Sequence, residues 1–234
     1  MASQVETKTN TQIDNEEVIP LRYSLASPSV TNETIIGWYK LAFSTRQLDD
    51  KAGTYIRRGM GWSYHARASG HEGIQIALGL SFHQNKDFLF PYYRDAGTCL
   101  AAGIPPYELF LNGLSRDDDP CSGGRHMSNH FGKPEINVQN VSSCTGNHTL
   151  HAVGVARAAR YFESDAIAFS SQGESSASEG YVFEALSGAC RERLPVCLAP
   201  VIRPKKLKIG YFSADFHIFP GMFLMAGLLE EHNR

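Results

Sequence analysis

The fold of this chain is predicted most clearly by one stretch, Asp165-Ala-Ile-Ala-Phe-Ser-Ser-Gln-Gly-Glu-Ser-Ser-Ala-Ser-Glu-Gly-Tyr-Val-Phe-Glu-Ala-Leu186. Its apolar start predicts a buried strand over residues 166–170, and its later part predicts an amphipathic helix over 179–191. The turn Gly173-Glu174 lies between them. In open α/β sheets, a turn at the carboxyl end of a strand is where phosphates and metal ions bind. The stretch therefore predicts an α/β fold with a ligand site at this turn.

Apolar residues continue the same pattern on both sides of this stretch. Strands that alternate with helices are typical of a parallel sheet flanked by helices, and we expect that fold class here. The further elements that we expect are helices over 33–48, 70–82, 105–111 and 148–161, and strands over 88–92 and 194–198.

Polar residues mark the expected helix starts and one long loop. Asn32 is placed to cap the first helix, and Ser176 with Glu179 forms a capping box for the helix at 179–191. Residues 113–132 are rich in Gly, Asp and Ser, which predicts an exposed loop.

The composition is that of an ordinary globular protein, with 42% hydrophobic and 20% charged residues in 234. A net charge of -2 gives no support to binding of nucleic acid or of a membrane surface. No apolar run approaches the ~20 residues of a membrane helix, and the acidic first thirty residues fit no leader sequence. Scattered cysteines without a C-x-x-C pair favour a reducing compartment. We therefore expect a soluble, cytoplasmic protein.

Composition also divides the chain into four parts. Residues 1–30 are polar and predict a disordered arm, and residues 31–198 carry the α/β pattern. Prolines and a basic run predict a linker over 199–206. Residues 207–234 predict a strand and a helix that do not continue the preceding pattern.

Two short motifs carry residue types suited to a phosphorylated ligand. Glu174 offers a carboxylate of the kind that Mg²⁺ prefers, and Gly173 lets the backbone approach phosphates. Arg94 presents a fork of donors for phosphate, to which the neighbouring hydroxyl of Tyr93 adds another. Taken alone, each motif has a plainer interpretation, namely a simple turn and a surface arginine beside a packed aromatic ring.

A third segment runs from Gly124-Arg-His-Met-Ser-Asn-His-Phe-Gly132 to Val141-Ser-Ser-Cys-Thr-Gly-Asn147. Its histidines, His126 and His130, fit an exposed polar loop when they are considered alone. Their spacing from the cysteines is not that of metal ligands.

Together, these segments resemble the alpha subunit of the thiamine-dependent, decarboxylating component of 2-oxo acid dehydrogenases, branched-chain type. The resemblance covers roughly residues 31–198 and rests on three motifs in the family's order, with Glu174 standing where the branched-chain type uses Glu. It implies a thiamine-diphosphate-binding fold, here truncated after about residue 198.

The resemblance also implies a cofactor site and leaves the catalytic residues unassigned. The implied ligands are thiamine diphosphate, Mg²⁺ and, as a further candidate, K⁺. The implied residues are Tyr93, Arg94, Gly173, Ser175 and Ser176 for the diphosphate, Ser143 and Thr145 for the aminopyrimidine ring, Glu174 for Mg²⁺, and Ser142 and Asn147 for K⁺.

A complete member of this family decarboxylates a branched-chain 2-oxo acid and passes the acyl group to a lipoyl group. Its partners are a beta-type subunit, which supplies the carboxylate that activates the thiamine ring, and a lipoyl-bearing acyltransferase. The chain departs from the pattern where the family's Asn-Asn pair completes the metal site, because Ile202 and Arg203 stand there.

Two other interpretations follow from these departures. One is a catalytically inactive, truncated fusion that at most binds a partner. The other is a fragment of a glycosyltransferase, because the tail from Lys206 to Arg234 resembles part of O-linked N-acetylglucosaminyltransferase-like proteins.

Overall fold

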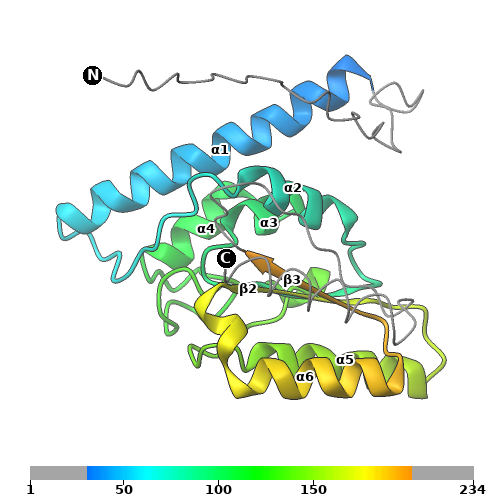
Figure 1. Cartoon of the computed structure of the whole chain (residues 1–234). Coiled ribbons are helices and arrows are strands. Elements are labelled where there is room, and N and C mark those ends of the chain that lie inside the picture. The colour runs from blue at the N-terminus through cyan, green and yellow to red at the C-terminus, as the bar shows by residue number, and fades with distance from the viewer. Residues whose placement is uncertain (1–30, 202–234) are drawn as a thin grey trace, which may run out of the picture.

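A three-stranded parallel sheet lies at the centre of the computed structural model, which describes residues 31–201 (Figure 1). Its strands are β1 (Phe88–Phe90), β2 (Ala168–Gly173) and β3 (Val196–Val201), in the order β1-β2-β3. Every residue of β2 is buried, as expected for a parallel strand covered on both faces. The predicted parallel sheet with flanking helices is confirmed.

The predicted ends of the chain lie outside the described residues. They are the arm at 1–30, most of the linker at 199–206 and the fragment at 207–234. β3 runs beyond residue 198 to Val201, so the start of the expected linker belongs to the sheet.

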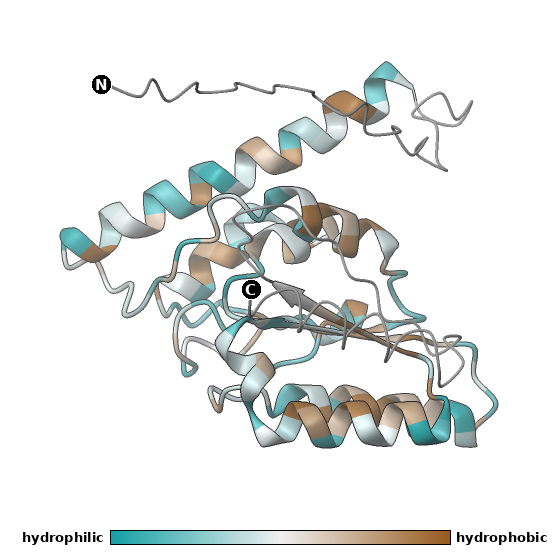
Figure 2. Cartoon of the chain, viewed as in Figure 1, coloured by the Kyte–Doolittle hydropathy of each residue, from teal (hydrophilic) through white to brown (hydrophobic). Residues whose placement is uncertain are grey.

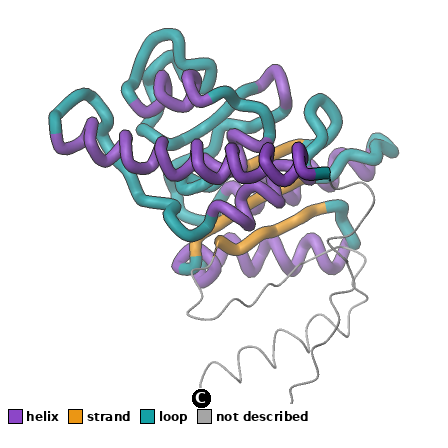
Figure 3. The backbone as a smooth tube through the Cα atoms, turned by 90° about the horizontal axis from the view of Figure 1, so that it is seen from above, coloured by secondary structure: helices purple, strands orange, loops and turns teal. Residues whose placement is uncertain are grey.

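Helices cover both faces of the sheet, as Figures 1 and 3 show. α5 and α6 lie side by side on one face and enclose an apolar core with β2 and β3. The other four helices form the opposite layer over Leu89 and Phe169. The helices are α1 (Asn32–Arg57), α2 (Glu72–Ser81), α3 (Ala96–Ala101), α4 (Pro106–Gly113), α5 (His148–Tyr161) and α6 (Gly180–Glu192).

The long helix α1 differs from its prediction at both ends. Thr31, not Asn32, is its N-cap, and the Thr31 side chain accepts the N–H of Thr34 at 3.2 Å. The helix continues past Leu48 because Asp49 is buried and hydrogen-bonded instead of ending the helix. Its first half projects from the body and carries hydrophobic residues (Figure 2). Several of these side chains are exposed, including that of Ile36.

Two further predictions about local structure are wrong. The expected capping box is absent, because Ser176 lies in the 3₁₀ turn η2 (Ser175–Ser178) and Glu179, the N-cap of α6, makes no side-chain cap bond. The loop at 113–132 is not exposed throughout, because Ser128 and His130 are buried. The Asn112 amide donates to the carbonyl oxygen of His130 at 3.1 Å and holds this loop against α4.

Within residues 31–201, no helix combines the length and apolar character needed to cross a lipid bilayer.

Candidate functional site

Three segments meet around Ser171, near the carboxyl ends of β1 and β2. The Ser171 hydroxyl accepts the backbone N–H of Tyr92 at 3.1 Å and donates to the carboxylate of Asp95. Its carbonyl oxygen accepts the Nε2–H of His148, at the start of α5, at 2.6 Å. The turn after β1, the end of β2 and the start of α5 are thereby joined.

Gly173 ends β2 under the ring of Tyr92. A Cβ atom on Gly173 would lie 2.6 Å from the Tyr92 hydroxyl oxygen and 2.9 Å from its Cζ, whereas ordinary contact begins at 3.4 Å. The Arg94 guanidinium donates to the same hydroxyl at 3.2 Å. The structure therefore places Tyr92, which the sequence analysis left unassigned, between Gly173 and Arg94. In the sequence, the only sign of such a role is that a second tyrosine precedes Tyr93.

Tyr93 stacks beside this contact. Its ring centre lies 3.9 Å from that of Tyr92 and 5.6 Å from that of Tyr64, and the Arg94 guanidinium carbon lies 5.0 Å from it. Burial raises the pKa of the Tyr93 hydroxyl, hydrogen bonds with Tyr92 and Tyr64 raise it further, and the Arg94 charge opposes them. The hydroxyl therefore keeps its proton and is a donor suited to an anionic oxygen.

Asp95 is a buried carboxyl group that the sequence analysis did not assign. Its Oδ2 accepts the N–H of Tyr92 at 3.2 Å, and its Oδ1 has no hydrogen-bond partner among the described residues. Burial raises the pKa of Asp95 to about 7, although the Tyr92 N–H and the Arg94 charge lower it. Asp95 thus braces the turn that presents Tyr93 and Arg94.

The turn after β2 presents Glu174 and Ser175 to solvent and buries Ser176. Gly146, with φ +81°, brings the start of α5 against this turn, since a Cβ there would lie 3.4 Å from the carbonyl oxygen of Ser176. Within residues 31–201, the Ser176 Oγ and the Asn147 Oδ1 are buried without a hydrogen-bond partner. These oxygens are free to bind a ligand or water.

The segment before α5 lies at the surface with Ser142, Ser143 and Thr145 exposed. The Ser143 hydroxyl lies 3.0 Å from Nε2 of His130, which stacks on His126 with ring centres 4.5 Å apart. Burial lowers the pKa of His130, so its ring is neutral near pH 7. This contact joins the loop at 124–132 to the segment at 141–147.

The residue types at this edge of the sheet fit a diphosphate bound with Mg²⁺. Arg94 and Tyr93 offer donors, and Glu174 offers a carboxylate. Among residues 31–201, no group of three His, Cys, Asp or Glu side chains is placed to hold a metal ion. A cation at Glu174 would therefore need phosphate oxygens as ligands, which is how Mg²⁺ is usually held.

A hollow of about 420 Å³ lies between α5 and α6. Its lining includes Arg157, Phe183 and Glu192 and none of the residues described above.

Comparison with known proteins gives one family and several curated relatives. Residues 39–202 match the family described as dehydrogenase E1 component. The 2-oxoisovalerate dehydrogenase subunit alpha of Bacillus subtilis is 31% identical over 167 residues, which cover 71% of this chain and 50% of the relative. The 3-methyl-2-oxobutanoate dehydrogenase subunit alpha of Mycobacterium tuberculosis is 31% identical, over 67% of this chain and 40% of the relative.

A pyruvate-type relative matches a longer part of the chain at lower identity. The pyruvate dehydrogenase E1 component subunit alpha of Staphylococcus aureus is 26% identical over 80% of this chain and 45% of the relative. The chain therefore spans about half the length of the curated relatives that it matches.

Proposed function

The chain belongs to the dehydrogenase E1 component family as an alpha-type domain, and from this premise we propose that it binds thiamine diphosphate with Mg²⁺. The observation that carries the proposal is the contact of Tyr92 with Gly173 beneath Arg94, because it brings the two phosphate motifs to one edge of the sheet. In this proposal, the diphosphate is held by Tyr93, Arg94, Gly173, Ser175 and Ser176, and Mg²⁺ by Glu174.

The start of α5 completes the proposed site. Ser143 and Thr145 contact the aminopyrimidine ring, and Ser142 with Asn147 forms a K⁺ site. The buried, unpartnered Oδ1 of Asn147 supports the K⁺ assignment, since K⁺ takes oxygen ligands.

The reaction that we propose is oxidative decarboxylation of a 2-oxo acid with acyl transfer to a lipoyl group. Bound thiamine diphosphate supplies a nucleophilic carbon and an electron sink for the loss of CO₂. The residues of this chain bind and orient it: Arg94 and Tyr93 fix the diphosphate, and Glu174 fixes the metal. A beta-type subunit and a lipoyl-bearing acyltransferase are the proposed partners.

A branched-chain 2-oxo acid is the substrate that we propose. Two relatives at 31% identity are named for 2-oxoisovalerate and 3-methyl-2-oxobutanoate, against 26% for the relative named for pyruvate. Glu174, the residue type that the resemblance associates with the branched-chain type, also supports this substrate.

The alternative is a chain that binds a partner without catalysis. It rests on Ile202 and Arg203 in place of the family's Asn-Asn pair, since a guanidinium at a Mg²⁺ ligand position would repel the ion. Both positions, and the tail that motivated glycosyl transfer, lie outside the described residues.

Calorimetric titration of the whole chain with thiamine diphosphate and Mg²⁺ tests the proposal. We expect micromolar binding that is lost in Glu174→Ala and kept in Glu184→Ala, which removes an exposed carboxylate from α6. The absence of binding heat in the unmodified chain would overturn the cofactor site and favour the non-catalytic alternative.

A further inference from the structure

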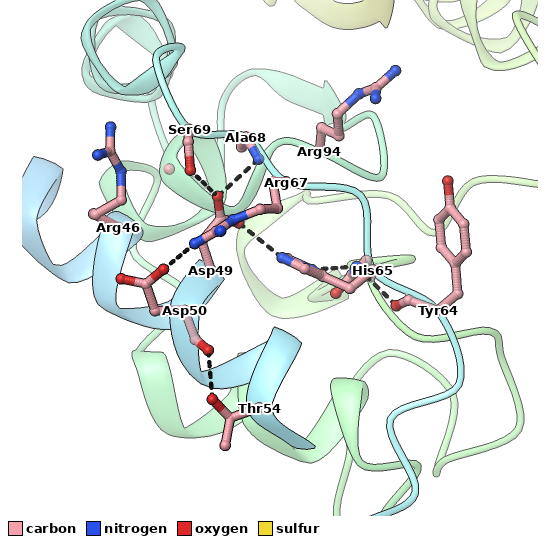
Figure 4. A network of polar contacts seen from close by, with 12 residues as sticks. Arg46, Asp49, Asp50, Thr54, Tyr64, His65, Arg67, Ala68, Ser69 and Arg94 are labelled. Carbon is pink, nitrogen blue, oxygen red and sulfur yellow. Dashed lines mark hydrogen bonds and ion pairs between the residues drawn. The ribbon is translucent and has the colours of Figure 1, made fainter. Parts of the chain in front are cut away.

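A buried carboxylate on α1 anchors the segment that leads to α2. Asp49 is 2% exposed, and its Oδ2 accepts the backbone N–H of Ala68 at 2.9 Å and the hydroxyl of Ser69 at 3.0 Å. Burial would raise the pKa of Asp49, but His65, Ser69 and the Ala68 N–H outweigh it and lower the pKa. Asp49 is therefore an anion inside the protein, and the His65 ring lies beside it (Figure 4).

His65 lies between this carboxylate and the loop at 124–132. Its Nε2 is 3.1 Å from Oδ1 of Asp49. Its Nδ1 is 3.2 Å from the Nδ2 of Asn129. Because the Asn129 amide nitrogen is a donor, Nδ1 must accept, and we assign the ring proton to Nε2, facing the carboxylate. The His65 ring thus connects Asp49 of α1 to Asn129, and we call these three residues the Asp49–His65–Asn129 relay.

Asn129 extends this relay to the candidate site. Its amide also donates to the carbonyl oxygen of Tyr64 at 3.2 Å, and Asn129 is 2% exposed. The Tyr64 ring meets that of Tyr93 edge to face, with centres 5.6 Å apart. The Trp62 ring packs edge to face on His65 at 6.1 Å from the other side. His65 is consequently enclosed, and a shift of its ring displaces the backbone of Tyr64.

We propose that His65 is a positioning residue of the cofactor site: the Asp49–His65–Asn129 relay holds Tyr64 against Tyr93. This inference rests on the proposed function, because Tyr93 is assigned there to the diphosphate. The relay belongs to α1 and to two loops that contribute no proposed ligand of their own, so it acts only through Tyr64.

The relay orders the Tyr93 side chain before the cofactor binds, so that less conformational entropy is lost on binding. Tyr93 has few other restraints at its outer face: Tyr92 lies beside it at 3.9 Å, and Arg94 lies over its ring at 5.0 Å. Outer-shell partners of metal ligands, which act in a comparable way, typically change metal affinity by about 10- to 100-fold. Since His65 acts through two intervening residues, we expect the lower end, about tenfold weaker binding of thiamine diphosphate in His65→Ala.

A matched histidine provides the control. His83 lies 3.1 Å from the buried Asp87, the same distance as His65 from Asp49, but its side chain is 74% exposed and it is not part of the relay. His83→Ala should leave the cofactor affinity unchanged. His65→Gln should restore most of it, because the glutamine side chain also carries an N–H donor that can face Asp49.

Fluorine NMR of the whole chain labelled with 3-fluorotyrosine gives a readout that needs no cofactor. The Tyr93 signal is identified by its loss in Tyr93→Phe. In His65→Ala, we expect it to move toward its position in Tyr64→Ala, while His83→Ala and His65→Gln leave it near the native position.

The two measurements separate the relay from the cofactor site. An unmoved Tyr93 signal in folded His65→Ala overturns the relay, and so does native affinity in that variant. If the unmodified chain binds no thiamine diphosphate, the proposed function fails, and the NMR signal alone decides whether His65 positions Tyr93.

Discussion

Gly173→Ala is the substitution with the most sharply defined outcome. The new Cβ atom would lie 2.6 Å from the Tyr92 hydroxyl oxygen, 2.9 Å from Cζ and 3.1 Å from Cε1. Ordinary contact begins at 3.4 Å, so the rigid, buried phenol ring must retreat by nearly an ångström. The Tyr92 ring cannot swing aside freely, because Arg94 and Tyr93 lie against it.

Overpacking of this kind costs about 1–3 kcal/mol. For a protein of this size, each kcal/mol lowers the melting temperature by roughly 2–4 °C, so the variant should melt roughly 2–12 °C below the native chain. The substitution should also weaken binding of thiamine diphosphate, because Arg94 follows the displaced Tyr92 hydroxyl. Differential scanning calorimetry and titration of the same sample measure both effects.

Gly154→Ala is the matched control for this substitution. Gly154 is exposed on α5, and a Cβ there would meet nothing within 4 Å. Replacing an unhindered helical glycine by alanine stabilises by roughly 0.5–1 kcal/mol. The two variants should therefore shift the melting temperature in opposite directions. A Gly173→Ala protein that melts at or above the native temperature would refute the close packing of Tyr92 on Gly173.

Three further predictions concern stability. Burial raises the pKa of Asp95 to about 7, above its ordinary 3.8, so the stability that the protonated carboxyl contributes is full below about pH 4 and is lost as the pH rises through 7. In urea unfolding from pH 4 to 8, the unfolding free energy of the native chain should therefore fall with pH, and that of Asp95→Asn should not. The same dependence on pH in both proteins would contradict the burial of Asp95. Leu194→Ala should lower the unfolding free energy by about 2–5 kcal/mol, because Leu194 is fully buried, whereas the half-exposed Leu80 should tolerate the same change; equal losses in urea melts would argue against this core. Thr31→Ala should remove the hydrogen bond that caps the Thr34 N–H and lower the stability of α1 by about 0.5–2 kcal/mol. Amide exchange in the first turn of α1 should then be faster, and unchanged exchange would show that the cap is dispensable.

The elements predicted most accurately from the sequence are those with one apolar and one polar face. α5 matches its predicted range at both ends because its apolar residues recur on one face only. α3 escaped prediction for the opposite reason: the residues from Ala96 to Leu100 are all buried, so they show no alternation of polar and apolar faces. The strand predicted over 166–170 begins two residues before β2. It also ends three residues too early, because Ser171 and Gln172 are polar yet buried inside the sheet.

The candidate site shows the same division. The resemblance implied that the segments at 92–97 and 173–176 serve one cofactor, and in the structure Tyr92 lies against Gly173. The roles of Asp95 and His65 could not be predicted, because they depend on partners distant in sequence: Ser171 for Asp95, and Asp49 with Asn129 for His65. The burial of a single Asp or His leaves no trace in the hydrophobic periodicity of the sequence.

A crystal structure of the whole chain with thiamine diphosphate and Mg²⁺ would test the central claim most directly. We predict diphosphate density at the carboxyl ends of β1 and β2, with Arg94 and Tyr93 on one side and Mg²⁺ bound by Glu174 on the other. Diphosphate bound elsewhere on the chain, or crystals grown in saturating cofactor that show none at this edge, would contradict it.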